Sequence, residues 1–134
     1  MKNILLIAVL VMSLQVSGIS SSNLPISNLT EKPQSPVAFS FIRGHKQGRS
    51  GYSLQWRMTN NSNIAHFEVL CTYEDPYDPY SNWTNLGMMN NFTANIFKFT
   101  HSNVLPGIIN YRIIAVLNNG SGTILSDIFT TTID

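Results

Sequence analysis

The pattern of apolar and polar residues changes character twice along the chain. Residues 4–12 form an unbroken apolar run, residues 21–36 lack an apolar period and contain several prolines, and residues 37–134 alternate short apolar runs with turn residues. The last part shows no convincing 3.6-residue period of a helix. The pattern therefore predicts an N-terminal targeting segment, a linker and an all-β domain.

Seven strands are expected in the domain. The most regular is centred on 109–115, where every second residue is apolar, and residues 52–58 show a similar alternation. The other five are expected at 37–42, 66–73, 82–89, 96–100 and 123–133. Asn119-Gly120 is a tight-hairpin signal, and residues 43–51 and 74–81 are expected to be loops. Strands of this length and spacing favour a seven-stranded Greek-key β-sandwich.

The inward phase of these strands predicts the core of the sandwich. The expected core residues are Trp56, Phe67, Val69, Trp83, Tyr111, Ile113 and Ala115. Cys71 is the chain's only cysteine, so no intramolecular disulfide can form. We expect it to be a buried thiol within the core, with a reactive or intermolecularly paired thiol as the alternative.

The first 20 residues have the layout of a secretory signal peptide. Lys2 precedes the apolar run, and the small residues Gly18 and Ser20 suit the positions before a cleavage site. The predicted organisation is a signal peptide at 1–20, a flexible linker at 21–36 and the β-sandwich at 37–134. The apolar run is too short to span a bilayer, so we expect no membrane span. The predicted location is secreted or at the cell surface, with the periplasm as a further possibility.

Several segments, taken in order, resemble a fibronectin type III domain. They are Trp56, Phe67-Glu68-Val69, Trp83 with Leu86, Leu105-Pro106-Gly107, and the run from Tyr111 to Val116. Ile109 occupies the place of the corner tyrosine of the usual pattern, with Tyr111 two residues later. Residues 97–100 and 110–112 look more like the variant of small exported bacterial proteins. The resemblance covers residues 36–134 and implies an immunoglobulin-like fold and a role in binding or adhesion.

Charge argues against a nucleic-acid partner. Of the eight Lys and Arg residues, Lys2 belongs to the predicted signal peptide, which leaves seven against seven Asp and Glu. A neutral chain has no overall field to attract phosphates. The stretch containing Arg43, His45, Lys46 and Arg49 could contact an anionic glycan or lipid headgroup, although we favour a solvated loop.

No constellation of catalytic or metal-binding residues is evident. His45, His66 and His101 are far apart and lack ligand-spaced neighbours, which disfavours zinc. Glu74, Asp75 and Asp78 do not have the spacing of an EF-hand loop. There is no nucleophile elbow or phosphate-binding glycine loop. The sequence therefore predicts no cofactor and no enzymatic activity. Five Asn-X-Ser/Thr sites, at Asn28, Asn60, Asn82, Asn91 and Asn119, are expected to be unused.

Two functional hypotheses remain. The first is a binding or adhesion module that recognises a protein or glycan outside the cell, with Tyr77, Tyr80 and Asp78 as the candidate ligand-binding residues, because tyrosines that follow prolines in a loop offer exposed flat rings. The second is a structural protein that assembles, including with itself, through the edge strands at 37–42 or 123–133.

Overall fold

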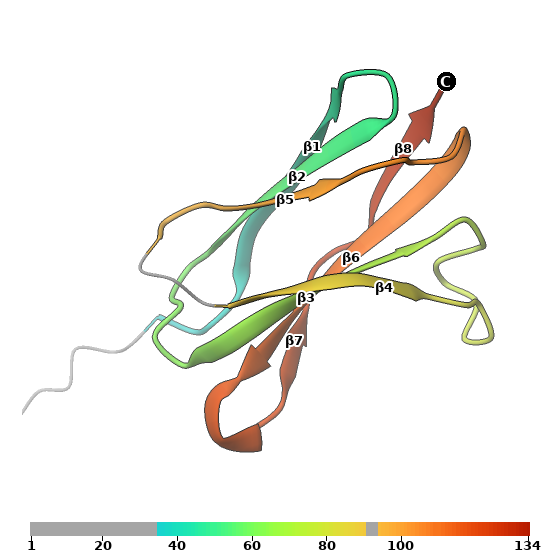
Figure 1. The fold of residues 1–134 in the computed structure, drawn as a ribbon. Coiled ribbons are helices and arrows are strands. Elements are labelled where there is room, and N and C mark those ends of the chain that lie inside the picture. The colour runs from blue at the N-terminus through green and yellow to red at the C-terminus, as the bar shows by residue number, and fades with distance from the viewer. Residues whose placement is uncertain (1–34, 91–93) are drawn as a thin grey trace, which may run out of the picture. The chain divides into compact units, whose positions relative to one another are not determined.

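A computed structural model of the chain describes residues 35–90 and 94–134 (Figure 1). The β-domain belongs to a compact unit that spans residues 33–134. The predicted signal peptide at 1–20 and all but the last two residues of the predicted linker lie outside the described residues. No helix in the described part of the chain is long and apolar enough to cross a bilayer.

The described residues form eight strands and one short 3₁₀ turn, η1 (Asn118–Gly120). The strands are β1 (Phe39–Gln47), β2 (Gly51–Met58), β3 (Ile64–Thr72), β4 (Thr84–Asn90), β5 (Phe97–His101), β6 (Gly107–Leu117), β7 (Thr123–Leu125) and β8 (Phe129–Ile133). Their alternation of apolar and polar residues matches a sheet with one buried face. The prediction of an all-β fold is confirmed.

Two antiparallel sheets make up a sandwich-like fold (Figure 1). One sheet has the order β1-β2-β5, and the other has the order β4-β3-β6, with both β7 and β8 paired to β6. Three aromatic rings join the sheets across the core. Trp56 of β2 meets Phe67 of β3 edge-on with ring centroids 5.4 Å apart and stacks on Phe97 of β5 at 6.0 Å.

The buried core contains most of the residues that the sequence predicts to face inward from the strands. Trp56, Phe67, Val69, Tyr111, Ile113 and Ala115 are fully buried, and Cys71 is a buried free thiol. Burial raises the pKa of the Cys71 thiol, which favours its neutral form. Trp83 differs from the prediction. It precedes β4 instead of lying within it, and it is only partly buried.

The first hairpin extends further than the sequence predicts. Residues 43–47 belong to β1 and pair with residues 51–55 of β2, so only residues 48–50 form the loop. Gly48 in this loop has φ = 66°, a conformation that glycine adopts without steric cost. The glycines that suggested a long loop therefore serve a tight connection, and the backbone ladder continues through Gly44.

The last predicted strand, 123–133, is two strands with an interruption. Ile114 pairs with Leu125 and Tyr111 with Phe129, so three residues of the edge face two residues of β6. At this bulge the Ile113 N–H donates to a side chain instead of a backbone carbonyl: the Ser126 Oγ accepts its hydrogen bond at 2.9 Å. This bulge turns the seventh predicted strand into β7 and β8.

Asn119-Gly120 forms a left-handed turn, although it lies within a longer connection. Asn119 and Gly120 have φ of 61° and 65°, and the Ser121 N–H donates to the Asn118 carbonyl at 3.4 Å. Positive φ at both central residues defines a type I′ turn. The whole connection between β6 and β7 comprises residues 118–122, so the hairpin is wider than a two-residue loop.

Candidate functional site

The candidate site is the segment between β3 and β4, residues 73–83, which we call the tyrosine loop. Its sequence repeats Asp-Pro-Tyr, at residues 75–77 and again at residues 78–80. Proline presets the backbone for the second position of a turn, and aspartate favours the first. The repeat therefore explains locally why this segment folds as two consecutive turns.

Each Asp-Pro-Tyr unit closes its own hydrogen bonds. In the first, Asp75 Oδ1 accepts the Tyr77 N–H at 3.0 Å and the Asp75 carbonyl accepts the Asp78 N–H at 3.2 Å. In the second, Asp78 Oδ1 accepts the Tyr80 N–H at 2.9 Å and the Asp78 carbonyl accepts the Ser81 N–H at 3.1 Å. The backbone of the loop is thus held by its own side chains.

The two ends of the tyrosine loop are tied together. Glu74 accepts hydrogen bonds from the backbone N–H of Asn82 at 2.9 Å and from the Asn82 amide at 3.3 Å. These bonds lower the pKa of the Glu74 carboxyl, so the group is ionised at neutral pH. Ser81 adds a bond from its hydroxyl to the Asp75 carbonyl at 2.6 Å.

A buried asparagine anchors the loop to the second sheet. Asn110 of β6 donates from its amide to the Glu74 carbonyl at 3.0 Å and accepts from the Thr130 hydroxyl of β8 at 2.7 Å. Asn110 is nearly inaccessible to solvent, and both ends of its amide are hydrogen-bonded. The loop is therefore positioned by strands from distant parts of the sequence.

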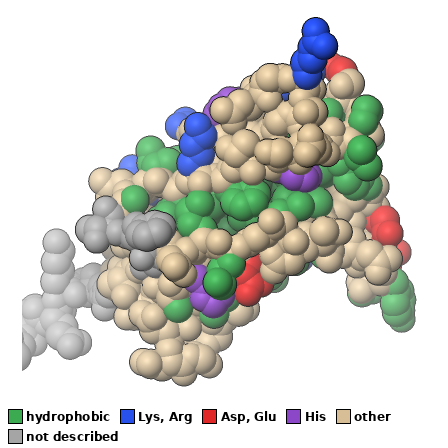
Figure 2. Space-filling model, in the orientation of Figure 1, with side chains coloured by type: hydrophobic (Ala, Val, Ile, Leu, Met, Phe, Trp, Pro, Cys, Tyr) green, Lys and Arg blue, Asp and Glu red, His purple; other side chains and the backbone are tan. Residues whose placement is uncertain are grey.

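The loop presents its two repeated tyrosines to solvent. The exposed fraction is 80% for Tyr77 and 90% for Tyr80. Figure 2 shows acidic and hydrophobic side chains gathered at the end of the domain where Figure 1 places the β3–β4 connection. Neither ring contributes to the core, so the fold does not require aromatic side chains at these positions.

The exposed apolar surface continues from the tyrosine loop to the β5–β6 connection. Tyr73 is partly exposed, and its hydroxyl accepts the Leu105 N–H at 3.1 Å and lies 3.4 Å from the Leu105 carbonyl oxygen. Leu105 is itself 66% exposed. Leu105 was singled out in the sequence only as part of Leu105-Pro106-Gly107, and no periodic signal marks it as a neighbour of the loop.

Trp83 closes the tyrosine loop and lies against an arginine. The Arg112 guanidinium is 5.1 Å from the centroid of the Trp83 ring, within the range of a cation–π contact. Arg112 lies on the outer face of β6, beside Leu70 of β3. Trp83 therefore lies against the outer face of the second sheet, where it contacts Arg112, and not in the core.

The basic stretch of the sequence is part of a strand. Arg43 donates to the Gln55 side chain at 3.0 Å and lies over the ring of Phe41, with 5.0 Å between the guanidinium carbon and the ring centroid. His45, Lys46 and Arg49 are exposed. The basic residues therefore lie on β1 and at the tip of the first hairpin, and not in the long loop that the sequence predicts.

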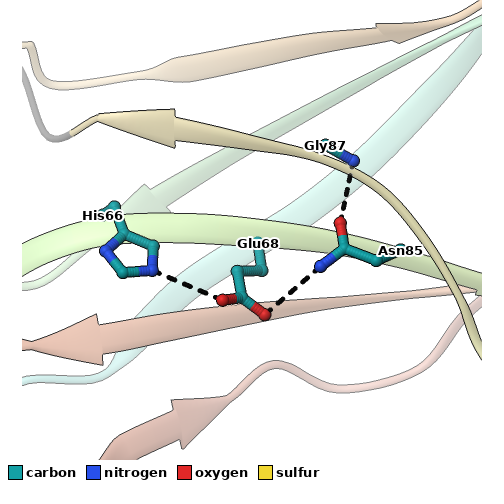
Figure 3. A network of polar contacts seen from close by, with 4 residues as sticks. All are labelled: His66, Glu68, Asn85 and Gly87. Atoms are coloured by element: carbon teal, nitrogen blue, oxygen red, sulfur yellow. Dashed lines mark hydrogen bonds and ion pairs between the residues drawn. The ribbon is translucent and has the colours of Figure 1, made fainter.

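A second polar cluster lies on the outer face of the β3–β4 pair (Figure 3). Glu68 contacts His66 at 3.4 Å and accepts from the Asn85 amide at 3.4 Å, while Asn85 Oδ1 accepts the Gly87 N–H at 2.9 Å. The register of β4 against β3 shifts at this point. The cluster therefore stabilises a strand irregularity, and no potential metal-binding group is found among the described residues.

The three described histidines lie apart, and His101 is the one placed at the core. Its Nδ1 is 3.0 Å from the Tyr111 hydroxyl, and the Tyr111 ring stacks on Tyr52 with centroids 5.8 Å apart. The Tyr111 hydroxyl therefore bonds a side chain of β5. Burial lowers the pKa of His101 and raises that of Tyr111, so both groups are neutral at neutral pH.

Comparisons with known proteins give a structural similarity and no family. No family model matches the chain, and no curated protein matches it. Among solved structures, the chain is similar to a superoxide reductase (neelaredoxin) from Ignicoccus hospitalis. The identity is 12% and the TM-score is 0.49, over 75% of this chain and 83% of that chain.

This comparison corrects the prediction that the chain is not an enzyme. As an exclusion the prediction was wrong, because the matched structure is named as a superoxide reductase. At 12% identity and a TM-score of 0.49, the similarity assigns neither an activity nor a site to this chain.

Proposed function

We propose that the chain is an exported binding module, related to fibronectin type III domains, that recognises a protein or glycan through the tyrosine loop. The observation that carries the proposal is the exposure of Tyr77 and Tyr80 on a loop whose backbone is closed by its own hydrogen bonds. Two large rings that do not pack into the core are available for a partner.

The connectivity of the strands supports the proposed relationship. The chain crosses between the sheets after β2, after β4 and after β5, and it places β5 beside β2 and β6 beside β3. Pairing of strands that are not consecutive in sequence is the mark of a Greek key. If β7 and β8 are counted as one interrupted edge strand, the sheets have three and four strands, in line with a seven-stranded immunoglobulin-like sandwich.

Preorganisation of the loop favours binding as its role. Association costs free energy when a side chain or loop must become ordered, and a loop that is already held in place avoids part of that cost. Tyrosine adds a large contact area with few rotatable bonds, and its hydroxyl can hydrogen-bond a partner. These properties suit a surface that binds by contact.

Assembly through edge strands is the less favoured function. No strand of the described residues pairs with the outer edge of β1, so this edge is open to another chain. However, β1 carries the exposed residues Arg43, His45 and Lys46. Charged side chains on an edge strand are a common protection against pairing with other chains. The edge is therefore less suited to assembly than the loop is to binding.

Removal of both exposed rings tests the proposal. The mature protein, residues 21–134, is screened on a glycan array and a peptide array, and the variant carrying Tyr77→Ala and Tyr80→Ala is screened beside it. We expect ligands of the parent protein to lose at least about tenfold in affinity, as for loss of an aromatic hot spot. The melting temperature should stay within about 2 °C, because neither ring is buried.

A matched control removes exposed apolar side chains elsewhere. Met88 and Leu125 are 63% and 52% exposed and lie on the outer face of the second sheet. The variant with Met88→Ala and Leu125→Ala should bind as the parent does. The proposal fails if the folded protein binds nothing on either array, or if the control variant loses binding as the tyrosine variant does.

A further inference from the structure

We infer that the partner of the tyrosine loop is cationic: a protein segment that bears lysine or arginine side chains. This inference rests on the proposed function and narrows its partner to one chemical class. It follows from three features of the loop, namely its unbalanced charge, the free oxygens of its aspartates and the rings beside them.

The charge of the tyrosine loop is entirely negative. Residues 73–83 contain Glu74, Asp75 and Asp78 and no Lys, Arg or His. The single ion pair found among the described residues joins His66 and Glu68, so none of these three carboxylates forms an ion pair with a cation of the described chain. The remainder of the mature chain has the compensating positive charge, which leaves the loop as a local acidic surface on a neutral protein.

Each aspartate of the repeat uses only part of its carboxylate within the loop. Oδ1 of Asp75 and Oδ1 of Asp78 accept the backbone N–H groups of Tyr77 and Tyr80. Neither Oδ2 takes part in a hydrogen bond among the described residues, and both aspartates are exposed. Each repeat unit therefore carries one free carboxylate oxygen and one exposed ring, two residues apart in sequence.

A carboxylate beside an aromatic ring recognises ammonium and guanidinium groups. The ring face attracts the cation, and the carboxylate accepts its hydrogen bonds. The same chain already uses ring faces in this way: Arg43 lies 5.0 Å from the centroid of Phe41, and Arg112 lies 5.1 Å from that of Trp83, at the end of the tyrosine loop. The two repeat units give two such places in succession.

A glycan would use this surface less completely. A neutral sugar could stack on the rings and hydrogen-bond the carboxylates, but the negative charge would contribute little to its affinity. An anionic glycan would be repelled by the three carboxylates. Only a cationic partner gains from the rings and the charge together, so charge complementarity selects a basic protein segment.

Asparagine substitutions separate charge from structure at this site. In a variant with Asp75→Asn and Asp78→Asn, the amide oxygens can still accept the N–H groups of Tyr77 and Tyr80, so the turns keep their hydrogen bonds. Only the charge is removed. The variant with Tyr77→Ala and Tyr80→Ala makes the complementary change, because it keeps the charge and removes the rings.

The experiment is a titration of the mature protein with labelled nona-arginine and nona-lysine peptides, with nona-glutamate and a glycine-serine peptide as controls. We expect the cationic peptides to bind and the controls not to bind. Removal of the two charges should weaken binding by roughly fivefold. Removal of the two rings should weaken it by at least about tenfold, as for the loss of an aromatic hot spot. Binding should also weaken as salt rises from 50 to 300 mM, because the Debye length shortens by roughly a factor of two over that range.

The outcomes distinguish this inference from the proposed function. Equal binding of cationic and neutral peptides, or unchanged affinity after the asparagine substitutions, overturns the cationic partner. A neutral oligosaccharide that binds independently of salt, and that is lost with the tyrosines but kept with the asparagine substitutions, also overturns it while leaving the binding module in place. Binding that is unaffected by loss of either the rings or the charges overturns both.

Discussion

At the scale of single residues, His101 is a titratable group that the fold places against its core, with the Tyr111 hydroxyl as its side-chain partner. It lies on β5 opposite Tyr52, and its Nδ1 meets the Tyr111 hydroxyl at 3.0 Å. Burial lowers the pKa of His101 below its usual value of 6.5. The neutral imidazole is therefore the form that the fold favours.

This shift predicts a dependence of stability on pH. Below about pH 6.5 the unfolded chain binds a proton at His101 that the folded chain resists, so stability should be full above that pH and fall as pH drops toward the lower folded pKa. Melting temperatures measured between pH 7.5 and 5.5 should decrease, and His101→Gln should flatten that decrease. His45→Gln, on the exposed surface, is the control; an unchanged slope in the His101 variant would contradict the prediction.

Residue identities predict burial better than they predict partners. The alternation around Trp56 and Tyr111 indicates their buried phase directly, because a strand has a period of two. The partner of the Tyr111 hydroxyl depends on how β5 and β6 lie across the core, which the local pattern does not contain. Trp83 is a large apolar side chain of the kind that is usually buried in a core. It lies instead against Arg112, on the outer face of β6.

At the scale of elements, Asn110 links β6, β8 and the tyrosine loop in one set of hydrogen bonds. Its amide nitrogen binds the Glu74 carbonyl and its amide oxygen binds the Thr130 hydroxyl. A buried amide of this kind holds the base of the loop at a fixed place on the sheet. The rigidity of the loop therefore depends on a residue outside it.

Truncation of this side chain should loosen the loop. Asn110→Ala removes two part-buried hydrogen bonds, one to the Glu74 carbonyl and one from the Thr130 hydroxyl, which should lower the free energy of unfolding by about 1–3 kcal/mol. Hydrogen exchange of the amides at 74–82 should become faster than that of the strands. Thr132→Ala, at an exposed position of β8, should change neither measurement. Exchange at 74–82 that stays as slow as in the parent would show that the loop holds itself.

The sequence predicts which segments form strands and turns better than it predicts the residues at which the strands begin and end. Asp-Pro-Tyr predicts turns, because aspartate and proline have local preferences that act within four residues. β1 continues to Gln47 because its backbone pairs with β2, and pairing outweighs the glycine content that suggested a loop. Similarly, the sequence pattern predicts that the strand continues through Ser126. The structure shows that β7 ends at Leu125 and that Ser126 lies in the bulge opposite Ile113.

At the scale of the whole molecule, the domain holds together without a covalent crosslink. Cys71 is a buried free thiol, and the two sheets meet through Trp56, Phe67 and Phe97. A domain of about 100 residues can be stable on such a core alone. Most contacts between its residues join positions that are well separated in sequence. We therefore expect folding to be slow relative to a helical protein of the same size.

The export proposal belongs to this scale as well. All described strands fall within the compact unit 33–134, so loss of residues 1–20 removes none of them. Protein recovered from the medium or the periplasm should begin near residue 21, as measured by the mass of the intact chain. Its melting temperature should equal that of residues 33–134 produced directly. An intact first residue on exported protein would contradict the predicted signal peptide.

The repetition within the tyrosine loop has a consequence for how this surface can vary. Each Asp-Pro-Tyr unit closes its own hydrogen bond from the tyrosine N–H to the aspartate. We therefore expect that one unit of three residues can be inserted or deleted while β3 and β4 keep their register. Such a change alters the number of rings displayed without altering the sandwich. The number of repeat units would then set how many rings contact a partner, so the affinity of the domain could change while its two sheets stay the same.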